Sequence, residues 1–201
     1  TVARRFADNW MLQGSYTWSH TYGNYEGTTN TDMGNPLAGM HSSFDTPGLM
    51  EHSSGDLPND FRHNLKLFGV YMYDFGLQLG GSLSWHTGQP LHTLGQHPSD
   101  PLTRWWGYSS FYADGEATWR GIRGRTPNVW SLDLMLKYDF RAAGVDWNLR
   151  ADVFNVFDND AEMLNHHWAE NPNNGVPEEY FGETEYCQQP RGVRFGVGLS
   201  F

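Results

Sequence analysis

The chain has 201 residues, a single cysteine and a formal net charge of −10 at neutral pH. This length suits one domain, so residues 1–201 are treated as a single unit. The lone Cys187 excludes an internal disulfide, and the acidic balance argues against nucleic acid as a partner. No apolar run reaches the roughly 20 residues that a transmembrane helix needs.

The acidic residues are concentrated in two segments. Residues 158–189 carry eight of them and residues 24–60 carry six, and neither segment contains Lys or Arg. Uniform charge blocks are typical of solvated chain. We therefore expect both segments to be exposed loops.

Strict alternation of apolar and polar residues predicts a first strand over residues 9–22. Its even positions carry Trp10, Leu12, Gly14, Tyr16, Trp18, His20 and Tyr22. The pattern then disappears in a stretch rich in Gly, Asn, Pro, Ser and Asp. Residues 23–60 are therefore predicted to form a long loop.

The next two predicted strands cover residues 61–73 and 77–86 and are joined by a tight turn at Asp74-Phe75-Gly76. In both strands Leu, Gly, Tyr and Trp alternate with polar residues. Residues 88–127 follow as a second long loop, which contains Trp105 and Trp106.

The fourth predicted strand shows the clearest alternation. Its apolar face carries Trp130, Leu132, Leu134, Leu136, Tyr138 and Phe140. A short turn containing Gly144 leads into a fifth strand that begins at Trp147 and extends to Phe157. Residues 158–189 are the third long loop, and the last strand runs from Pro190 to Phe201, with every second residue apolar.

Long and short connections alternate along this chain, so all long loops lie at one end of the sheet. Outer-membrane barrels show this asymmetry, with short periplasmic turns and long extracellular loops. Aromatic residues also gather near both ends of the apolar face, as at the two membrane interfaces. We therefore predict an all-β fold, an antiparallel transmembrane β-barrel segment of about six strands. Its lipid-facing residues include Trp130, Leu132, Leu134, Leu136 and Tyr138.

Two motifs resemble a known family. Asn155-Val156-Phe157-Asp158 and the terminal stretch Pro190-Arg-Gly-Val-Arg-Phe-Gly-Val-Gly-Leu-Ser-Phe201 resemble the C-terminal end of TonB-dependent outer-membrane receptors. The stretch from Arg62 to Leu67 is similar to a strand of the Oar-like receptors in particular. The resemblance implies that residues 1–201 are the C-terminal part of a 22-stranded barrel. It also implies a fragment without plug domain, TonB box or signal peptide.

The same resemblance implies a location in the outer membrane of a Gram-negative cell and a transport function. The parent protein would take up a scarce solute, with energy from the TonB complex through its missing N-terminal part. Outer-membrane lipid, an unknown solute and the barrel-assembly machinery, through Phe201, are the implied partners. The barrel-closing strand would be marked by Pro190, Arg191, Phe195 and Phe201. No enzymatic activity, catalytic residue, cofactor or metal is expected.

Three groups of residues are candidates for chemistry. Exposed loop aromatics can hold a ligand, so Trp105, Trp106 and Trp168 are candidates for substrate contact, although packing between loops explains such residues more often. Ser84, His86 and Asp133 have the residue types of a hydrolase triad, but a polar barrel interior contains the same types. His166 and His167 with nearby acids have metal-binding chemistry, against which stands a solvated acidic loop.

Three alternatives to the receptor hypothesis stay open. The first is a plain outer-membrane porin or adhesion barrel without energy coupling. The second is a soluble β-barrel binding module whose apolar face points inward. About eight strands already give an interior only just filled by side chains, so six strands cannot enclose this many aromatic and Leu residues. An outer-membrane enzyme is the last alternative.

Overall fold

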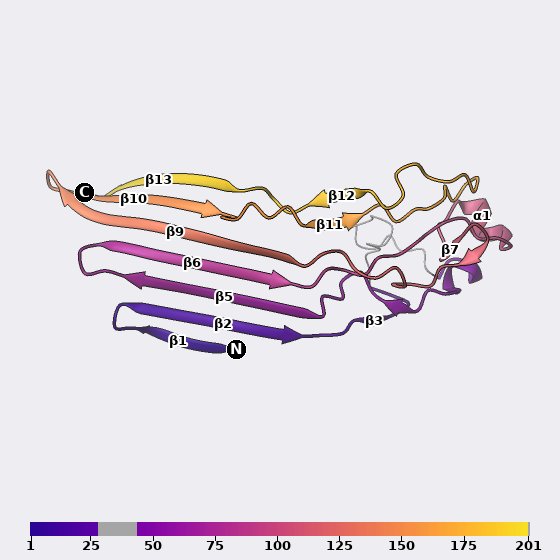
Figure 1. The fold of residues 1–201 in the computed structure, drawn as a ribbon, viewed down its shortest axis with the longest axis horizontal. Coiled ribbons are helices and arrows are strands. Elements are labelled where there is room, and N and C mark those ends of the chain that lie inside the picture. Colours follow the sequence, from indigo (N-terminus) through magenta and orange to yellow (C-terminus); the bar gives the residue numbers. More distant parts are fainter. Residues whose placement is uncertain (28–43, 201) are drawn as a thin grey trace.

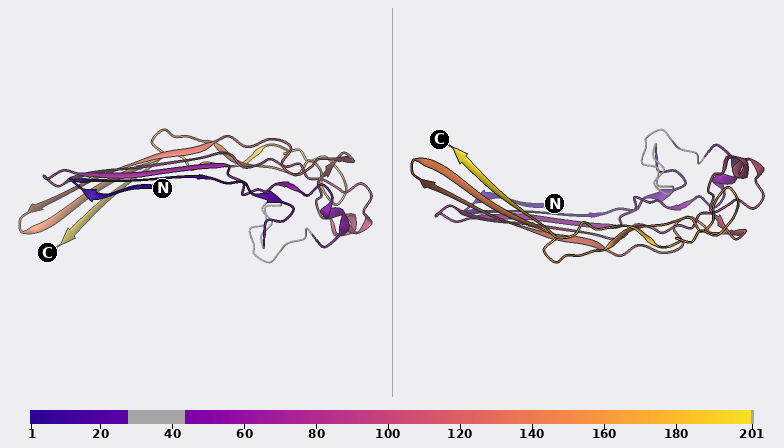
Figure 2. Two further views of the ribbon diagram at one scale, coloured as in Figure 1. Left: turned by 90° about the horizontal axis from the view of Figure 1, so that it is seen from below. Right: turned by 90° about the horizontal axis from the view of Figure 1, so that it is seen from above.

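The computed structural model describes residues 1–27 and 44–200, and its main feature is one antiparallel sheet of seven strands (Figure 1). The strands follow one another in the sheet as they do in the sequence. Figure 2 shows the sheet edge-on as a thin, curved layer. The strands are β1 (Val2–Ala7), β2 (Trp10–Trp18), β5 (His63–Met72), β6 (Leu77–His86), β9 (Val129–Ala142), β10 (Val145–Phe154) and β13 (Gly192–Ser200).

The short connections all lie at one end of this sheet. The turn between β1 and β2 places Asp8 and Asn9 at φ values of 50° and 67°, and the turn between β9 and β10 places Ala143 and Gly144 at 54° and 81°. Consecutive left-handed residues favour the tight hairpin turns that match strand twist. The long connections lie at the other end. The all-β class, the antiparallel pairing and the asymmetry of connections predicted from the sequence are confirmed.

The structure corrects the predicted strands in two respects. A seventh strand, β1, pairs with β2 and was not predicted, because Arg4 interrupts its apolar face and a register irregularity before Ala7 breaks the period. Two strands also end early. β2 stops at Trp18, and Tyr22 pairs instead in a separate small sheet. β10 stops at Phe154, where Asn155 takes a left-handed φ of 47°.

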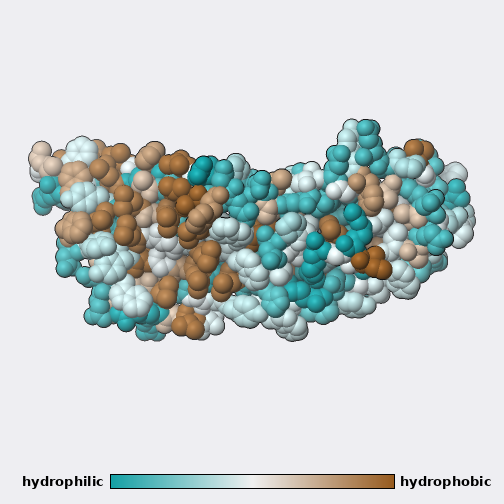
Figure 3. Space-filling view, viewed as in Figure 1, coloured by the Kyte–Doolittle hydropathy of each residue, from teal (hydrophilic) through white to brown (hydrophobic). Residues whose placement is uncertain are grey.

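One face of the sheet is apolar across all its central strands. The register places Leu83 opposite both Leu67 and Leu132, and Trp85 opposite Trp130. In the described part of the chain no second layer covers this face, so 45% of Leu134 is exposed. Figure 3 shows apolar side chains gathered over the strands and polar ones over the loops. An apolar surface of this extent indicates contact with a partner or a membrane.

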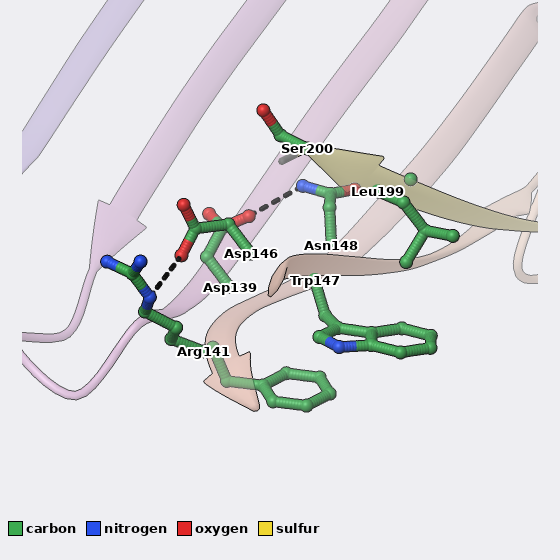
Figure 4. A pocket seen from close by; sticks show the side chains of 9 residues that line it. Asp139, Arg141, Asp146, Trp147, Asn148, Leu199 and Ser200 are labelled. Carbon is green, nitrogen blue, oxygen red and sulfur yellow. Dashed lines mark hydrogen bonds and ion pairs between the residues drawn. The ribbon is translucent and has the colours of Figure 1, made fainter. Parts of the chain in front are cut away.

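The opposite face is polar and internally hydrogen bonded. Asp139 accepts from Gln78 Nε2 at 2.9 Å, from Lys137 Nζ at 2.8 Å and from Asn148 Nδ2 at 2.6 Å. Near the short turns Asp139 and Asn148 border a hollow of about 530 Å³, where Trp147 points away from both of them (Figure 4). Because both carboxylate oxygens of Asp139 accept hydrogen bonds from protein donors, this cluster is a satisfied network.

The long connections fold into a second region, here called the loop layer, which comprises the described parts of residues 19–62, 87–128 and 155–191. It contains the chain's buried apolar core: Leu49, Leu57, Leu94, Phe111 and, at the start of β9, Val129. Its short elements are β3 (Tyr22–Gly23), η2 (Pro47–Met50), β4 (Gly55–Asp56), α1 (Pro101–Trp106), β7 (Tyr112–Ala113), β8 (Glu116–Ala117), β11 (Glu162–Asn165) and β12 (Thr184–Cys187). Cys187 is free and exposed. Among the described residues, no helix is long and apolar enough to cross a membrane.

The two edge strands give the first prediction. In the described sheet β1 and β13 each have a partner on one side only. Open strand edges pair with other chains and are not tolerated in lipid. The isolated 201-residue chain should therefore self-associate after refolding in detergent, as measured by analytical ultracentrifugation. A monodisperse monomer with native strand content would contradict this expectation.

Candidate functional site

The helix α1 lies at the far end of the loop layer (Figure 1) and ends in two adjacent tryptophans. Asp100 caps its first turn by accepting from the backbone N–H groups of Leu102 and Thr103, and Pro101 fits the first helical position. Gly107, at φ 64°, ends the helix in the left-handed conformation. A helix this short needs such caps to persist. The helix therefore fixes the positions of the two side chains at its C-terminal end.

Those side chains are Trp105 and Trp106, which are 83% and 63% exposed. The ring of Trp106 stacks on that of Tyr108, with centroids 6.4 Å apart and planes 15° from parallel. Exposed aromatic faces on a fixed backbone can contact a solute with little loss of side-chain entropy. This geometry suits the contact role predicted for the two tryptophans.

The third candidate, Trp168, has a different setting. Its backbone bridges that of Leu94, and its ring meets that of His166 edge-on at 5.2 Å. It is only partly exposed. The Trp168 backbone therefore joins the second and third long loops, and Trp105 and Trp106 are the more exposed of the three candidate tryptophans.

Contacts between the first two long loops fix the position of α1. The Asp100 carboxylate accepts from Gly48 N at 2.8 Å, and the hydroxyls of Thr46 and Thr103 hydrogen bond at 2.5 Å. Burial tends to raise the pKa of Asp100, but the hydrogen bonds from Gly48, Leu102 and Thr103 outweigh it, so the pKa lies below its usual value. The helix is thus anchored through an ionised carboxylate.

A second link between these loops centres on Tyr112. Its hydroxyl donates to Glu51 Oε2 at 2.5 Å and contacts His52 Nε2 at 3.1 Å. The hydrogen bond from Tyr112 lowers the pKa of Glu51 and raises that of Tyr112 itself. His97 Nδ1 accepts from two backbone N–H groups, those of Ser99 and Asp100. This fixes His97 as the tautomer with hydrogen on Nε2, which faces Glu51 at 3.3 Å.

Two carboxylates and two guanidinium groups form a cluster where the loop layer meets the sheet. Asp60, whose side chain is fully buried, accepts from Thr21 N at 2.6 Å, from Arg62 Nε at 2.6 Å and from Arg125. Asp56 accepts from Arg62 at 2.8 Å and from Arg125 at 2.9 Å. The cluster, called the Asp–Arg clamp below, joins the first long loop to the second.

The Asp–Arg clamp has the only three-ligand metal geometry among the described residues. Ligand atoms of His20, Asp56 and Asp60 lie within 4.8 Å of one another. Both carboxylates are already neutralised by Arg62 and Arg125, and a cation there would meet those guanidinium charges. The residues present therefore fit an ion-pair cluster better than a metal site.

The other residues predicted to carry chemistry are not brought together. His166 Nδ1 pairs with Glu185 at 2.8 Å, and neither residue belongs to a three-ligand group that could hold a metal among the described residues. His86 Nδ1 contacts its neighbour's carbonyl, Thr87 O, at 2.9 Å. Asp133 is bound to Ser131 Oγ and to Asn155 N, each at 2.8 Å. The Asp133 carboxylate therefore binds a Ser hydroxyl and a backbone N–H group instead of an imidazole, which is inconsistent with a triad.

The motif around Asn155 folds into a turn that fastens β10 to β13. The Asn155 side chain accepts from Asn159 N at 3.0 Å and donates to the carbonyls of Asn159 and Gln189, both at 2.8 Å. Asp158 accepts from Arg191 N at 2.7 Å. Asn tolerates the left-handed backbone that this turn requires. Pro190 lies between the two anchored residues, and Phe201 lies outside the described residues.

Sequence reasoning missed the acids that serve as internal acceptors. Asp60 and Glu170 were expected in exposed loops, but both are buried. Glu170 accepts from Asp114 N at 2.6 Å and from Gln96 N at 3.2 Å. The arginines of the second loop were the sequence signal that some of these acids are buried. Buried carboxylates need partners, and the acidic segments contain no Lys or Arg of their own.

The sequence was compared with protein-family models and with known proteins to test the resemblance. No protein-family model matches the sequence. The chain is 33% identical, over 164 residues and 77% of its length, to the TonB-dependent transporter Oar of Myxococcus xanthus. The chain is related to the TonB-dependent transporters. The Oar-like resemblance predicted from its motifs is confirmed.

The aligned part of this Oar-like chain spans 14% of the length of the Oar transporter. Among solved structures, it is similar to the ferric-catecholate import receptor Fiu of E. coli K12 in its closed form. That similarity has a TM-score of 0.46 and 18% sequence identity, and it covers 98% of this chain and 19% of the receptor.

The Asp–Arg clamp gives the second prediction. Asp60→Asn, made in the full-length protein, leaves two guanidinium groups facing one carboxylate and should destabilise the loop layer by about 3 kcal/mol. The Thr21 amide donates a hydrogen bond to Asp60, so hydrogen exchange at this amide should accelerate strongly in the variant. Asp45→Asn removes the same charge from an exposed loop position and is the matched control. Unchanged exchange at Thr21 in Asp60→Asn would contradict the role of the clamp.

The same clamp should loosen in acid. Burial tends to raise the pKa of Asp56 and of Asp60, but the hydrogen bonds from His20, Thr21 and the two arginines outweigh it, and both pKa values are lowered. A lowered folded-state pKa stabilises the fold fully above the unfolded value of about 4 and progressively less as pH falls through the folded value. Thr21 protection, corrected for intrinsic exchange, should therefore be constant near neutral pH and fall only below about pH 4.

Proposed function

We propose that this chain forms part of the wall of an outer-membrane β-barrel in a TonB-dependent receptor, as its C-terminal portion. The observation that carries the proposal is the single-layer sheet with one apolar and one polar face. A soluble protein must bury its apolar face against a second layer. In the described residues that face is open over β2, β5, β6, β9, β10 and β13, which supports a lipid environment.

In this proposal each face of the sheet has its own surroundings. Trp130, Leu132, Leu134, Leu136 and Tyr138 contact outer-membrane lipid, while the network around Asp139 lines the barrel interior. Transmembrane barrels have this apolar exterior and polar interior. The strand from Pro190 through Phe195 to Phe201 closes the barrel, and the barrel-assembly machinery recognises it through Phe201.

The loop layer supplies the solute-binding part of the proposed function. It lies on the extracellular side, where Trp105 and Trp106 contact a scarce solute. Energy for release into the barrel comes from the TonB complex through parts of the receptor that are not in this chain. The caps of α1 and its hydrogen bonds to the first long loop support this role because they hold the exposed aromatics in fixed positions.

A plain outer-membrane porin is the alternative with the most similar architecture. It shares the apolar face, the polar face and the loop asymmetry, but it needs no energy coupling. The relation to the TonB-dependent transporter Oar favours the receptor. Energy dependence of uptake is therefore the property that separates the two.

The fourth prediction concerns uptake by the full-length protein. Cells expressing it should deplete one component of a defined medium, measured by mass spectrometry, and a protonophore should stop this depletion. The double variant Trp105→Ala/Trp106→Ala should weaken apparent affinity about tenfold, because each aromatic contact contributes about 0.5–1.5 kcal/mol. Tyr180→Ala, an exposed loop aromatic outside α1, is the control and should retain uptake.

The possible results distinguish the two functions. Depletion that continues in the presence of the protonophore would show passive diffusion and support the porin. Energy-dependent depletion that is equal in the double variant and in Tyr180→Ala would keep the receptor but remove α1 from solute binding.

A further inference from the structure

A buried histidine lies directly before α1. His97 is 2% exposed, and its ring packs against the backbone of η2, since a Cβ built on Gly48 would lie 2.8 Å from the His97 Cδ2 atom. The His97 Nδ1 atom accepts from Asp100 N at 2.8 Å and from Ser99 N at 3.2 Å. These two N–H groups belong to the turn that starts the helix. One ring nitrogen therefore sets the backbone conformation from which α1 begins.

The neutral ring uses both of its nitrogens in this position. Because Nδ1 is an acceptor, the single ring hydrogen lies on Nε2, which faces Glu51 Oε2 at 3.3 Å. A second proton can be added only at Nδ1, where it would point at two N–H groups and remove their acceptor. The Glu51 carboxylate attracts a positive ring, but it lies at the other nitrogen and cannot replace the two lost hydrogen bonds. Protonation of His97 therefore opposes the closed turn.

Two carboxylates and a phenol face His97 from neighbouring elements. Burial tends to raise the pKa of Asp100, but its hydrogen bonds from Gly48 and α1 outweigh this effect, and the hydrogen bond from Tyr112 lowers the pKa of Glu51. The same bond to Glu51 raises the pKa of Tyr112. Asp100 and Glu51 therefore stay ionised, and Tyr112 stays protonated, over the pH range in which histidine side chains titrate.

Two further titratable groups lie one step away from His97. Because Tyr112 donates to Glu51, its oxygen accepts from His52 Nε2 at 3.1 Å. The His52 Nδ1 atom makes no hydrogen bond within the described residues, so a proton added there displaces none. Glu170, from the third long loop, accepts from the backbone N–H of Gln96 and does not bind the His97 ring.

We propose that His97 is a positioning residue whose protonation releases α1, and with it Trp105 and Trp106, from the first long loop. Asp100 connects the two events, because its N–H group binds His97 while its carboxylate caps the helix and binds Gly48 N. The inference rests on the proposed solute contact of the two tryptophans and adds a regulation to it. Solute held at neutral pH is released in acid.

The size of the effect follows from proton linkage. A histidine in the opened, solvated turn binds a proton with the ordinary pKa of about 6.5. The closed turn has no position for that proton. The population of the open turn should therefore rise about tenfold between about pH 7.5 and pH 5.5, so the closed form is favoured above this range and is lost as pH falls through it.

The test measures hydrogen exchange of the full-length receptor at the Leu102 and Thr103 amides, which Asp100 caps. After correction for intrinsic exchange, opening in the wild type should increase about tenfold between the two pH values. His97→Asn places an amide oxygen where Nδ1 accepts and does not titrate, so its exchange should not depend on pH. His52→Gln keeps a donor for Tyr112 without a titratable ring and should behave like the wild type.

The Thr21 amide of the Asp–Arg clamp is the internal reference, and its protection should be constant over the same pH range. Exchange at α1 that is independent of pH in the wild type, or a parallel loss of protection at Thr21, would overturn the proposal without any variant. Equal pH dependence in the wild type and in His97→Asn would also overturn it. No solute is present in this measurement. If the two tryptophans prove irrelevant to uptake, the proposed solute contact fails and the exchange result is unaffected.

Discussion

The structure depends on the open apolar face of a single-layer sheet. Seven strands pair in one sheet that leaves the outer edges of β1 and β13 unpaired, and in the described residues neither face is covered by a second layer. Leu, Val and aromatic side chains exposed in this way are unfavourable in water, where burial of each contributes about 1.5–3 kcal/mol. The sheet is therefore stable only in surroundings that supply the missing apolar contact. This requirement connects strand pattern, turn position and proposed location.

The loop layer meets a different requirement. Its long backbone segments carry many polar groups, so hydrogen bonds and ion pairs hold it together in addition to its small buried apolar core. The side chains of Asp60, Glu170, Asn155 and Asp100 each hydrogen bond with at least one group that is distant in sequence. Buried acceptors of this kind give a loop one defined conformation, since each unpaired group would cost about 1–3 kcal/mol. The result is a fixed platform that leaves Trp105 and Trp106 exposed.

The sheet could be predicted from the sequence because its signal has period two. Leu132, Leu134 and Leu136 occupy every second position, and the structure places them on one face. β1 escaped prediction because Arg4 occupies the apolar face and packs on Trp10. The predicted strands β2 and β10 extend too far along the chain, because Thr21 and Asn155 make hydrogen bonds that the alternation of apolar and polar residues does not encode. The loop contacts had no local signal, since Asp60 and Arg125 are far apart in the chain.

The most direct test of the account compares two neighbouring residues of β9 that lie on opposite faces. In the full-length receptor without other cysteines, Leu134→Cys and Met135→Cys would carry a fluorophore in bilayers with brominated acyl chains. Both native residues are apolar, so the comparison separates location from hydrophobicity. Bromine quenches only at short range, and the account predicts strong quenching at position 134 and little at 135. Equal quenching at both positions, or none at 134, would contradict a lipid-facing sheet.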